Sequence, residues 1–219
     1  LFKMLHEVTK KHAYETASNV ALQWLIKHTY AQEAVPIQRG KGDSTIATDT
    51  YAWTIAAIGP AKLQEMQMNP DQIMEFAEQN CSVEASFLRP EGWIVKIKGF
   101  DFAPQRHVAR GGIVSSEWTA QMVLAFKIMA DYYRLEKDFA KADVYDEKAE
   151  VYLNELTHML ISSPSPSGQG EGCLPYATQD NVDTGHGWMT PKGQSTGSVA
   201  GTAYALFAYY NFNPLALKD

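Results

Sequence analysis

The chain has 219 residues, of which 45% are hydrophobic and 20% are charged, a composition typical of a globular protein. Its net charge of −6 comes with no basic block, which argues against nucleic acid as a partner because phosphates attract a positive stripe. No apolar run approaches the roughly 20 residues that cross a bilayer, so we expect no membrane span.

The first residues, "LFKMLHEVTKK", resemble the interior of a helix and contain neither an initiator Met nor a signal peptide. We therefore expect the chain to be part of a longer protein. Residues 13–30 carry apolar side chains at helical spacing, which predicts a helix. Pro36, Gly40 and Gly42 predict a loop after it.

A second helix is predicted from Thr48 to Ala57, ended by the Gly-Pro pair that follows. A short amphipathic helix over 70–80 has Asn69 as its N-cap and Pro70 at its first position. We interpret 82–115 as a long loop with room for a small hairpin, and its four aromatic residues argue against disorder.

The clearest helix covers 116–135 and is capped by Ser115 or Ser116. An amphipathic helix over 138–161 follows, and then a Pro- and Gly-rich loop over 162–172. The polar stretch from 173 leads directly into an apolar helix, predicted from Ser198 to Tyr210.

Three apolar helices share a pattern: each has a long loop before it, a polar cap, and then closely spaced Ala and aromatic residues. They read "TDTYAWTIAAIG", "SSEWTAQMVLAFK" and "GSVAGTAYALFAYY", and more charged helices lie between them. Such alternation is typical of a double ring, in which inner helices are buried all round and outer helices on one side.

These phrases, with "DNVDTGHGW", resemble the (α/α) toroid of six-hairpin glycosidase-like proteins. The resemblance implies an all-α fold of alternating inner and outer helices with long loops lining a cleft. The chain would form a single domain over 1–219, the C-terminal half of a six-hairpin toroid, with the remaining N-terminal part of the same protein as its partner. It also favours an extracellular or periplasmic location and a carbohydrate substrate.

Carboxyl groups occur at the junctions where these loops enter the apolar helices. Glycoside hydrolysis uses two carboxyl groups, one to protonate the leaving oxygen and one to attack the sugar or activate water. We expect Glu117 to be the general acid and Asp183 or Asp49 to be its partner. The alternative is that Asp49 and Glu117 only stabilise the dipoles of the helices they begin.

Six further residues are candidates for sugar binding. Aromatic rings stack on the apolar faces of sugars, Arg and His donate hydrogen bonds, and the neighbouring glycines allow close approach. The candidates are Arg110, Trp118, His186, Trp188, Tyr176 and Trp93. Trp118 could equally belong to the core, and the loop around Asp183 could be held by its own turns.

Other kinds of site find little support in the sequence. The six histidines form no zinc motif, and "DNVDTG" lacks the downstream Glu of an EF-hand. We therefore expect no metal and no cofactor. Cys81 and Cys173 are expected to be separate thiols, although a disulfide between them is possible.

The leading hypothesis is thus a glycoside hydrolase acting on an oligo- or polysaccharide. A polysaccharide lyase is an alternative, in which Tyr176 or His107 would take a proton and Arg106 or Arg110 would offset a uronate charge. The acidic balance of the chain fits a uronate polymer poorly. A non-catalytic helical scaffold or surface protein is the other alternative.

Overall fold

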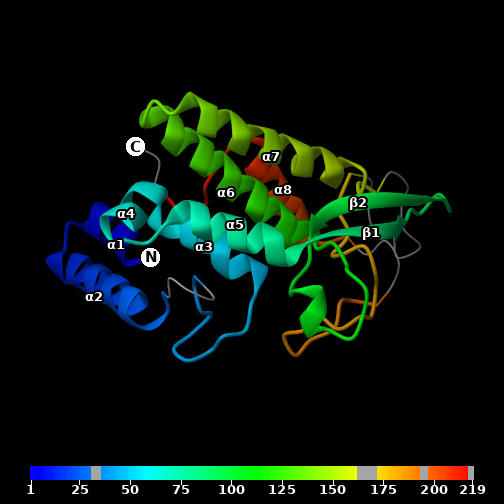
Figure 1. Ribbon diagram of the computed structural model, residues 1–219, viewed down its shortest axis with the longest axis horizontal. Helices are drawn as coiled ribbons and strands as arrows, with labels where there is room; N and C mark the ends of the chain where they lie inside the picture. Colours follow the sequence, from blue (N-terminus) through cyan, green and yellow to red (C-terminus); the bar gives the residue numbers. More distant parts are fainter. Residues whose placement is uncertain (31–35, 162–171, 193–196, 217–219) are drawn as a thin grey trace.

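A computed structural model describes residues 1–30, 36–161, 172–192 and 197–216 of the chain (Figure 1). The predicted loop over 162–172 lies almost wholly outside these residues. Helices form close to where the sequence predicts them: α2 (His12–His28), α3 (Thr48–Ile58), α5 (Pro70–Cys81), α6 (Ser116–Leu135), α7 (Phe139–Thr157) and α8 (Val199–Tyr209). The described residues also form α1 (Phe2–Thr9), α4 (Pro60–Glu65) and a 3-10 turn over Gln105–His107.

The expectation of an all-α toroid is wrong, because the stretch expected to be a long loop contains a β-hairpin. Strands β1 (Ser82–Leu88) and β2 (Ile94–Phe100) pair antiparallel, from Ser82 opposite Phe100 to Leu88 opposite Ile94. In β1 the side chains at 83, 85 and 87 are buried and alternate with less buried ones. This period of two is the strand signal, and it makes the protein a mixed α/β fold.

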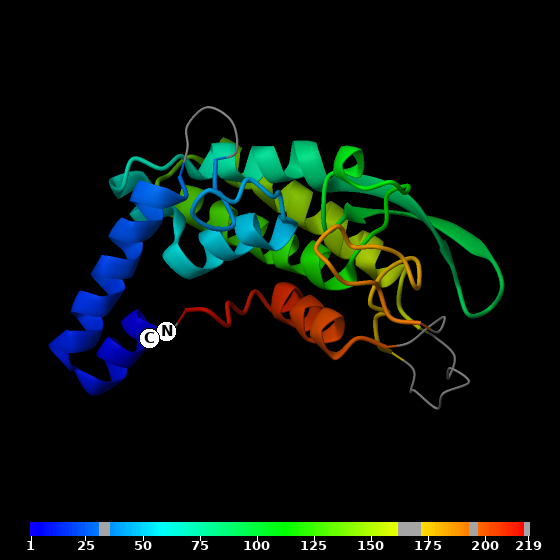
Figure 2. The same cartoon turned by 90° about the horizontal axis from the view of Figure 1, so that it is seen from below.

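Helix α6 is the centre of the molecule and is buried on nearly all sides. It packs against α3, α7 and α8, while α5 packs against α3. The views in Figures 1 and 2 agree that α8 lies beyond α6, on the side away from α5. The main core lies among α3, α5, α6 and α7, and a second core lies between the hairpin, α6 and the end of α7.

Small residues explain how the apolar helix α8 approaches α6. A Cβ atom placed on Gly201 would collide with the Oγ of Ser116 in the first turn of α6. The helix can therefore cross here only because position 201 has no side chain. Ser198 caps α8 by accepting a hydrogen bond from the Gly201 amide at 2.9 Å.

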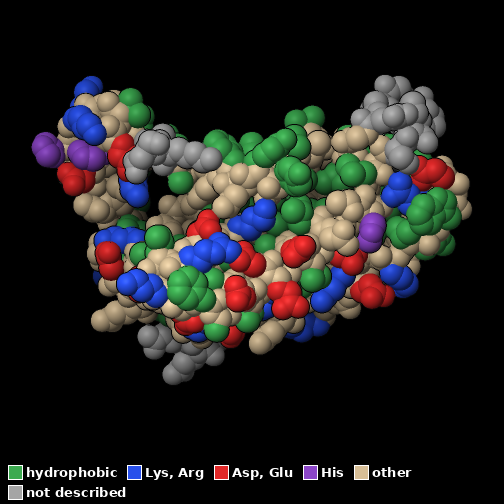
Figure 3. Space-filling view, turned by 90° about the horizontal axis from the view of Figure 1, so that it is seen from above, with side chains coloured by type: hydrophobic (Ala, Val, Ile, Leu, Met, Phe, Trp, Pro, Cys, Tyr) green, Lys and Arg blue, Asp and Glu red, His purple; other side chains and the backbone are tan. Residues whose placement is uncertain are grey.

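The other face of α8 is exposed. Figure 3 shows hydrophobic side chains gathered along the edge of the molecule on which α8 lies. The most exposed of them are Val199, Leu206, Tyr209 and Tyr210. Helices α1 and α2 pack on each other and project from one end of the molecule (Figure 2). Over the described ranges, no helix combines the length and the apolar character that crossing a membrane requires.

Candidate active site

The segments that precede α3, α6 and α8 are joined to one another at one end of these helices. The Thr48 amide donates to the Phe102 carbonyl at 3.3 Å, and the Ser116 amide donates to the Tyr176 carbonyl at 3.2 Å. The Ser198 amide in turn donates to the Leu174 carbonyl at 2.7 Å. The N-terminal turns of the three helices therefore face a common region, and those of α3 and α6 carry the carboxyl groups of Asp49 and Glu117.

Asp49 of α3 and Glu117 of α6 are the two carboxyl groups that interact there. Burial raises the pKa of Glu117, and the nearby charge of Asp49 raises it further. Burial also raises the pKa of Asp49, although the Thr50 amide and Arg39 act in the opposite direction. A carboxyl group in the first turn of an exposed helix would be stabilised in its charged form, so the raised values here reflect removal from water.

The polar stretch over 173–192, called the polar loop below, supplies aromatic rings around this pair of carboxyl groups. Trp188 is 43% exposed, and its indole nitrogen donates to the Tyr176 hydroxyl at 3.2 Å. Burial raises the pKa of Tyr176, and the charge of Glu117 adds to the effect. The His186 ring lies 5.5 Å from Trp188 and 5.6 Å from Trp118, measured between ring centroids. These rings give the site a wall suited to a sugar face.

His186 is held in one tautomer by its two neighbours. Its Nε2 lies 2.8 Å from the Phe102 carbonyl oxygen, which can only accept, so Nε2 carries the proton. The Nδ1 atom is then free to accept from Arg39, at 3.4 Å. Arg39 also pairs with Asp43 at 2.9 Å, so its charge is already partly engaged.

Trp118 is 6% exposed, and its ring packs edge-on against Phe102 at 4.8 Å. It belongs to a small core cluster with Ala47, Ile113 and Ala177. It therefore supports the wall of the site and leaves little surface for a ligand.

Asp183 and Arg110 are engaged in the structure of the loop. The Asp183 side chain accepts from the Gly185 amide at 2.8 Å, which forms a turn, and its main-chain carbonyl accepts from Arg110. The Arg110 guanidinium also makes two 2.7 Å hydrogen bonds to the fully buried Asp101. Arg110 thus ties the loop to the end of β2.

Trp93 lies away from these residues, at the outer end of the hairpin, where the Arg89 guanidinium sits 5.1 Å from its ring. Arg106 and His107 form part of the 3-10 turn, and Arg106 donates to Asn80 at 2.5 Å. Cys81 and Cys173, both within the described part, form no disulfide.

Sequence reasoning missed three residues near the carboxyl pair: Trp53, Gln121 and Tyr204. Trp53 and Gln121 each follow a carboxylate by four residues, a spacing that places them on the same face of the helix as Asp49 and Glu117. This signal was available. Tyr204 of α8 could be placed only by the packing of α8 on α6, and burial and the charge of Glu117 raise its pKa.

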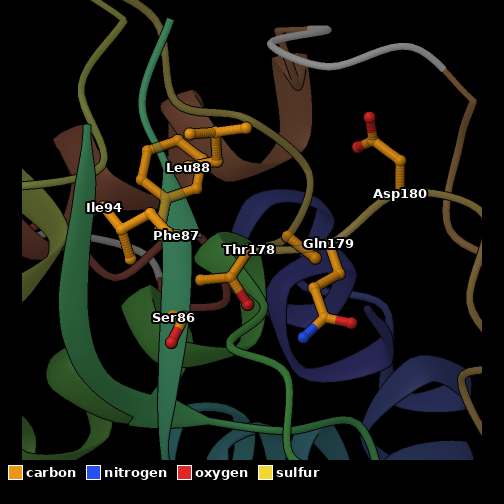
Figure 4. Close-up of a pocket in the computed structure, with 8 residues that line it drawn as sticks. Ser86, Phe87, Leu88, Ile94, Thr178, Gln179 and Asp180 are labelled. Carbon is orange, nitrogen blue, oxygen red and sulfur yellow. The ribbon is translucent and has the colours of Figure 1, made fainter. Parts of the chain in front are cut away.

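A separate hollow of about 320 Å³ lies between β1 and residues 177–180 (Figure 4). Ser86, Leu88 and Ile94 line one side of it, and Gln179 and Asp180 line the other. Burial raises the pKa of Asp180. No second carboxyl group lines this hollow among the described residues, so it offers no acid pair.

Within the part of the chain that the structure covers, no three His, Cys, Asp or Glu residues come together in a way that could hold a metal ion. Comparison of the sequence and structure with protein-family models, curated proteins and solved structures found no match.

Proposed function

We propose that the protein is a glycoside hydrolase that acts on a neutral oligo- or polysaccharide. What supports this most is the coupling of Asp49 and Glu117, two half-buried carboxyl groups on different helices whose pKa values are both raised. Paired carboxyl groups beside aromatic rings are the equipment that this reaction needs. The proposal does not depend on a toroidal fold.

The surroundings of the two acids differ, and the difference assigns their roles. The Thr50 amide and Arg39 favour the charged form of Asp49, against the effect of burial. Burial and the charge of Asp49 both favour the neutral form of Glu117. Glu117 is then the general acid that protonates the glycosidic oxygen, and Asp49 is the carboxylate that activates water or attacks the sugar.

The nearby cations favour a neutral substrate. Arg39 is paired with Asp43, and Arg110 is committed to Asp101. A uronate or sulfate would therefore meet two acids without an uncommitted guanidinium from either of these residues. The lyase alternative is weaker for a further reason: burial raises the pKa of Tyr176, whereas a proton-abstracting phenolate needs a lowered value.

The test is reducing-sugar release from a panel of neutral and acidic polysaccharides, measured on the wild type and three variants. Glu117→Gln and Asp49→Asn should each reduce kcat/KM by about 100- to 10,000-fold, the usual contribution of an acid or base group. Asp183→Asn is the matched control: an Asn oxygen can still accept from the Gly185 amide, so its activity should stay within about twofold of the wild type. Loss of activity in Asp183→Asn alone would refute the assignment.

One observation favours a second candidate, a non-catalytic helical scaffold. The exposed apolar side chains of α8 form the kind of patch that commonly marks an interaction surface (Figure 3). If no polysaccharide in the panel releases sugar and light scattering finds a stable oligomer, this candidate replaces the first.

A further inference from the structure

Gln121 lies one helical turn after Glu117 and is 3% exposed. Its Nε2 donates to Glu117 Oε1 at 3.0 Å. Its own Oε1 is buried and has no hydrogen-bond partner among the residues that the structure describes. A buried amide oxygen without a partner costs free energy, so a Gln at this position needs a reason that a Leu or Met would not need.

The Gln121 side chain is almost fully buried beside Glu117. It lines a small hollow together with side chains of α3, α6, α8 and the segment after α8. The residues that share this lining include Trp53, Leu124, Tyr204, Asn213 and Leu215. The segment after α8 is anchored to α3, because the Asn213 amide nitrogen donates to the Ala56 carbonyl at 2.7 Å. Burial and the hydrogen bond to Glu117 thus place the Gln121 amide next to this carboxyl group.

An amide presents a donor and an acceptor at equal reach, and a half turn exchanges them. The nitrogen suits an ionised carboxylate, which only accepts, while the oxygen suits a protonated carboxyl group, which donates. We propose that Gln121 positions the Glu117 carboxyl in both protonation states, donating from Nε2 to the carboxylate and accepting at Oε1 from the protonated acid. The partnerless oxygen is then the acceptor for the state in which Glu117 carries its proton.

This inference rests on the proposed function, in which Glu117 must change its protonation state in every cycle. Before reaction, protonated Glu117 donates to Gln121 Oε1 until a glycosidic oxygen competes for that proton. The proton passes to the glycosidic oxygen as the bond from that oxygen to the sugar carbon breaks, while the carbon forms a bond to the Asp49 carboxylate or to a water that Asp49 deprotonates. Reaction and proton exchange with water later restore both acids, and in between Glu117 is a carboxylate. Nε2 then holds the carboxylate in place, so Gln121 itself gains and loses no proton.

Other charged and titratable groups also face Glu117 and would remain in a Gln121 variant. They are Asp49 on α3, Tyr204 on α8 and Tyr176 in the polar loop. His186 and Arg39 act on the same region through Asp49. A change confined to Gln121 therefore isolates the amide.

The test combines carboxyl carbon NMR titration of Glu117, assigned by its absence in Glu117→Gln, with the pH profile of sugar release. Gln121→Met keeps the volume and removes both the donor and the acceptor. Because a hydrogen bond to a charged group is the stronger of the two, its loss should raise the pKa of Glu117 and move the loss of activity at high pH to a higher pH. We expect kcat to fall about tenfold near neutral pH, with KM unchanged within about twofold.

Gln121→Glu adds a second acid and should raise the pKa of Glu117 more than Gln121→Met does, which gives a second route if one variant folds poorly. Met122→Leu, on the buried neighbouring position of α6, should leave the titration unchanged. An unaltered pKa of Glu117 in both Gln121 variants would overturn the inference whatever the activity. Full activity in Glu117→Gln would instead overturn the proposed function, and the titration would still decide the role of Gln121.

Discussion

Half-buried carboxylates in two parts of this protein have pKa values that are shifted in opposite directions. Asp71, at the start of α5, accepts hydrogen bonds from Tyr133 at 2.6 Å, Tyr145 at 2.7 Å and Lys141 at 3.0 Å. Burial alone would raise its pKa, but these three donors outweigh burial and lower it. Burial prevails at Asp49 and Glu117, where the pKa is raised.

The opposite pKa shifts therefore come from the number of hydrogen-bond donors around each carboxylate and not from burial. The carboxylate on α5 joins three helices by hydrogen bonds and a cation, which makes it part of the framework. Asp49 and Glu117 have fewer donors, so the free-energy cost of burying their charged forms is not offset by hydrogen bonds. Carboxyl groups with raised pKa values are concentrated at functional sites, because acid and base catalysis requires pKa values near neutral pH.

Asp101 is a fully buried carboxylate that is paired with Arg110, and loss of this pair gives the largest predicted change in stability. Arg110→Met removes the guanidinium from a fully buried carboxylate and should destabilise the protein by about 3–5 kcal/mol. Urea unfolding at neutral pH measures it. The control is Arg39→Met, whose pair with Asp43 is partly open to solvent, so the loss of stability should be clearly smaller than in Arg110→Met. Equal losses in the two variants would contradict the distinction.

The Asp71 network gives the next largest effect. Asp71→Asn leaves one acceptor oxygen for three donors and should cost about 2–3 kcal/mol of unfolding free energy at pH 7. Because the folded pKa of Asp71 is lowered, its stabilisation is present above the unfolded value near 4 and is lost as pH falls through the folded value. Urea unfolding at pH 7 and pH 3 should therefore show a difference that shrinks in acid, and a constant difference would refute the role of the charge.

Helical periodicity predicted most of the helices because helix signals are local, but it did not predict the mixed α/β fold. The Asn69 and Ser115 caps form as expected, accepting from the Gln72 and Trp118 amides. The hairpin was underestimated because Gly and Pro around it obscured a short alternating strand. The projecting α1–α2 pair and the exposed face of α8 could not be predicted, since no local pattern says which face of a helix remains uncovered.

The site was predictable in its residue types but not in its pairing. Carboxylates in or before the first turns of the apolar helices suggested Asp49, Glu117 and Asp183 alike. Only the crossing of α3 and α6 couples the first two, and only the Arg110 contact shows that the Asp183 loop is held to the framework. Such choices depend on tertiary contacts between residues more than 60 positions apart, which a single sequence does not specify.

The coupling of Asp49 and Glu117 can be tested by removing the charge of Asp49. Asp49→Asn removes the like charge that raises the pKa of Glu117, so this pKa should fall while the effect of burial remains. Carboxyl NMR titration of Glu117 measures the shift. The Asp183→Asn variant should leave the titration unchanged. A Glu117 pKa that does not respond to Asp49→Asn would show that the two acids are not coupled.

The smallest effect is a gain in stability. A carboxyl whose folded pKa is raised binds more protons when folded than when unfolded, so its contribution to stability falls as pH rises through that window. Glu117→Gln removes the free-energy cost of holding a charged Glu117 at this half-buried position. The variant should therefore raise Tm at pH 7 by about 2–4 °C, the change that about 1 kcal/mol produces in a protein of this size. Below about pH 4, where Glu117 is protonated in both states, the two proteins should melt together. A lower Tm at pH 7 would mean that Glu117 belongs to the framework, as Asp71 does.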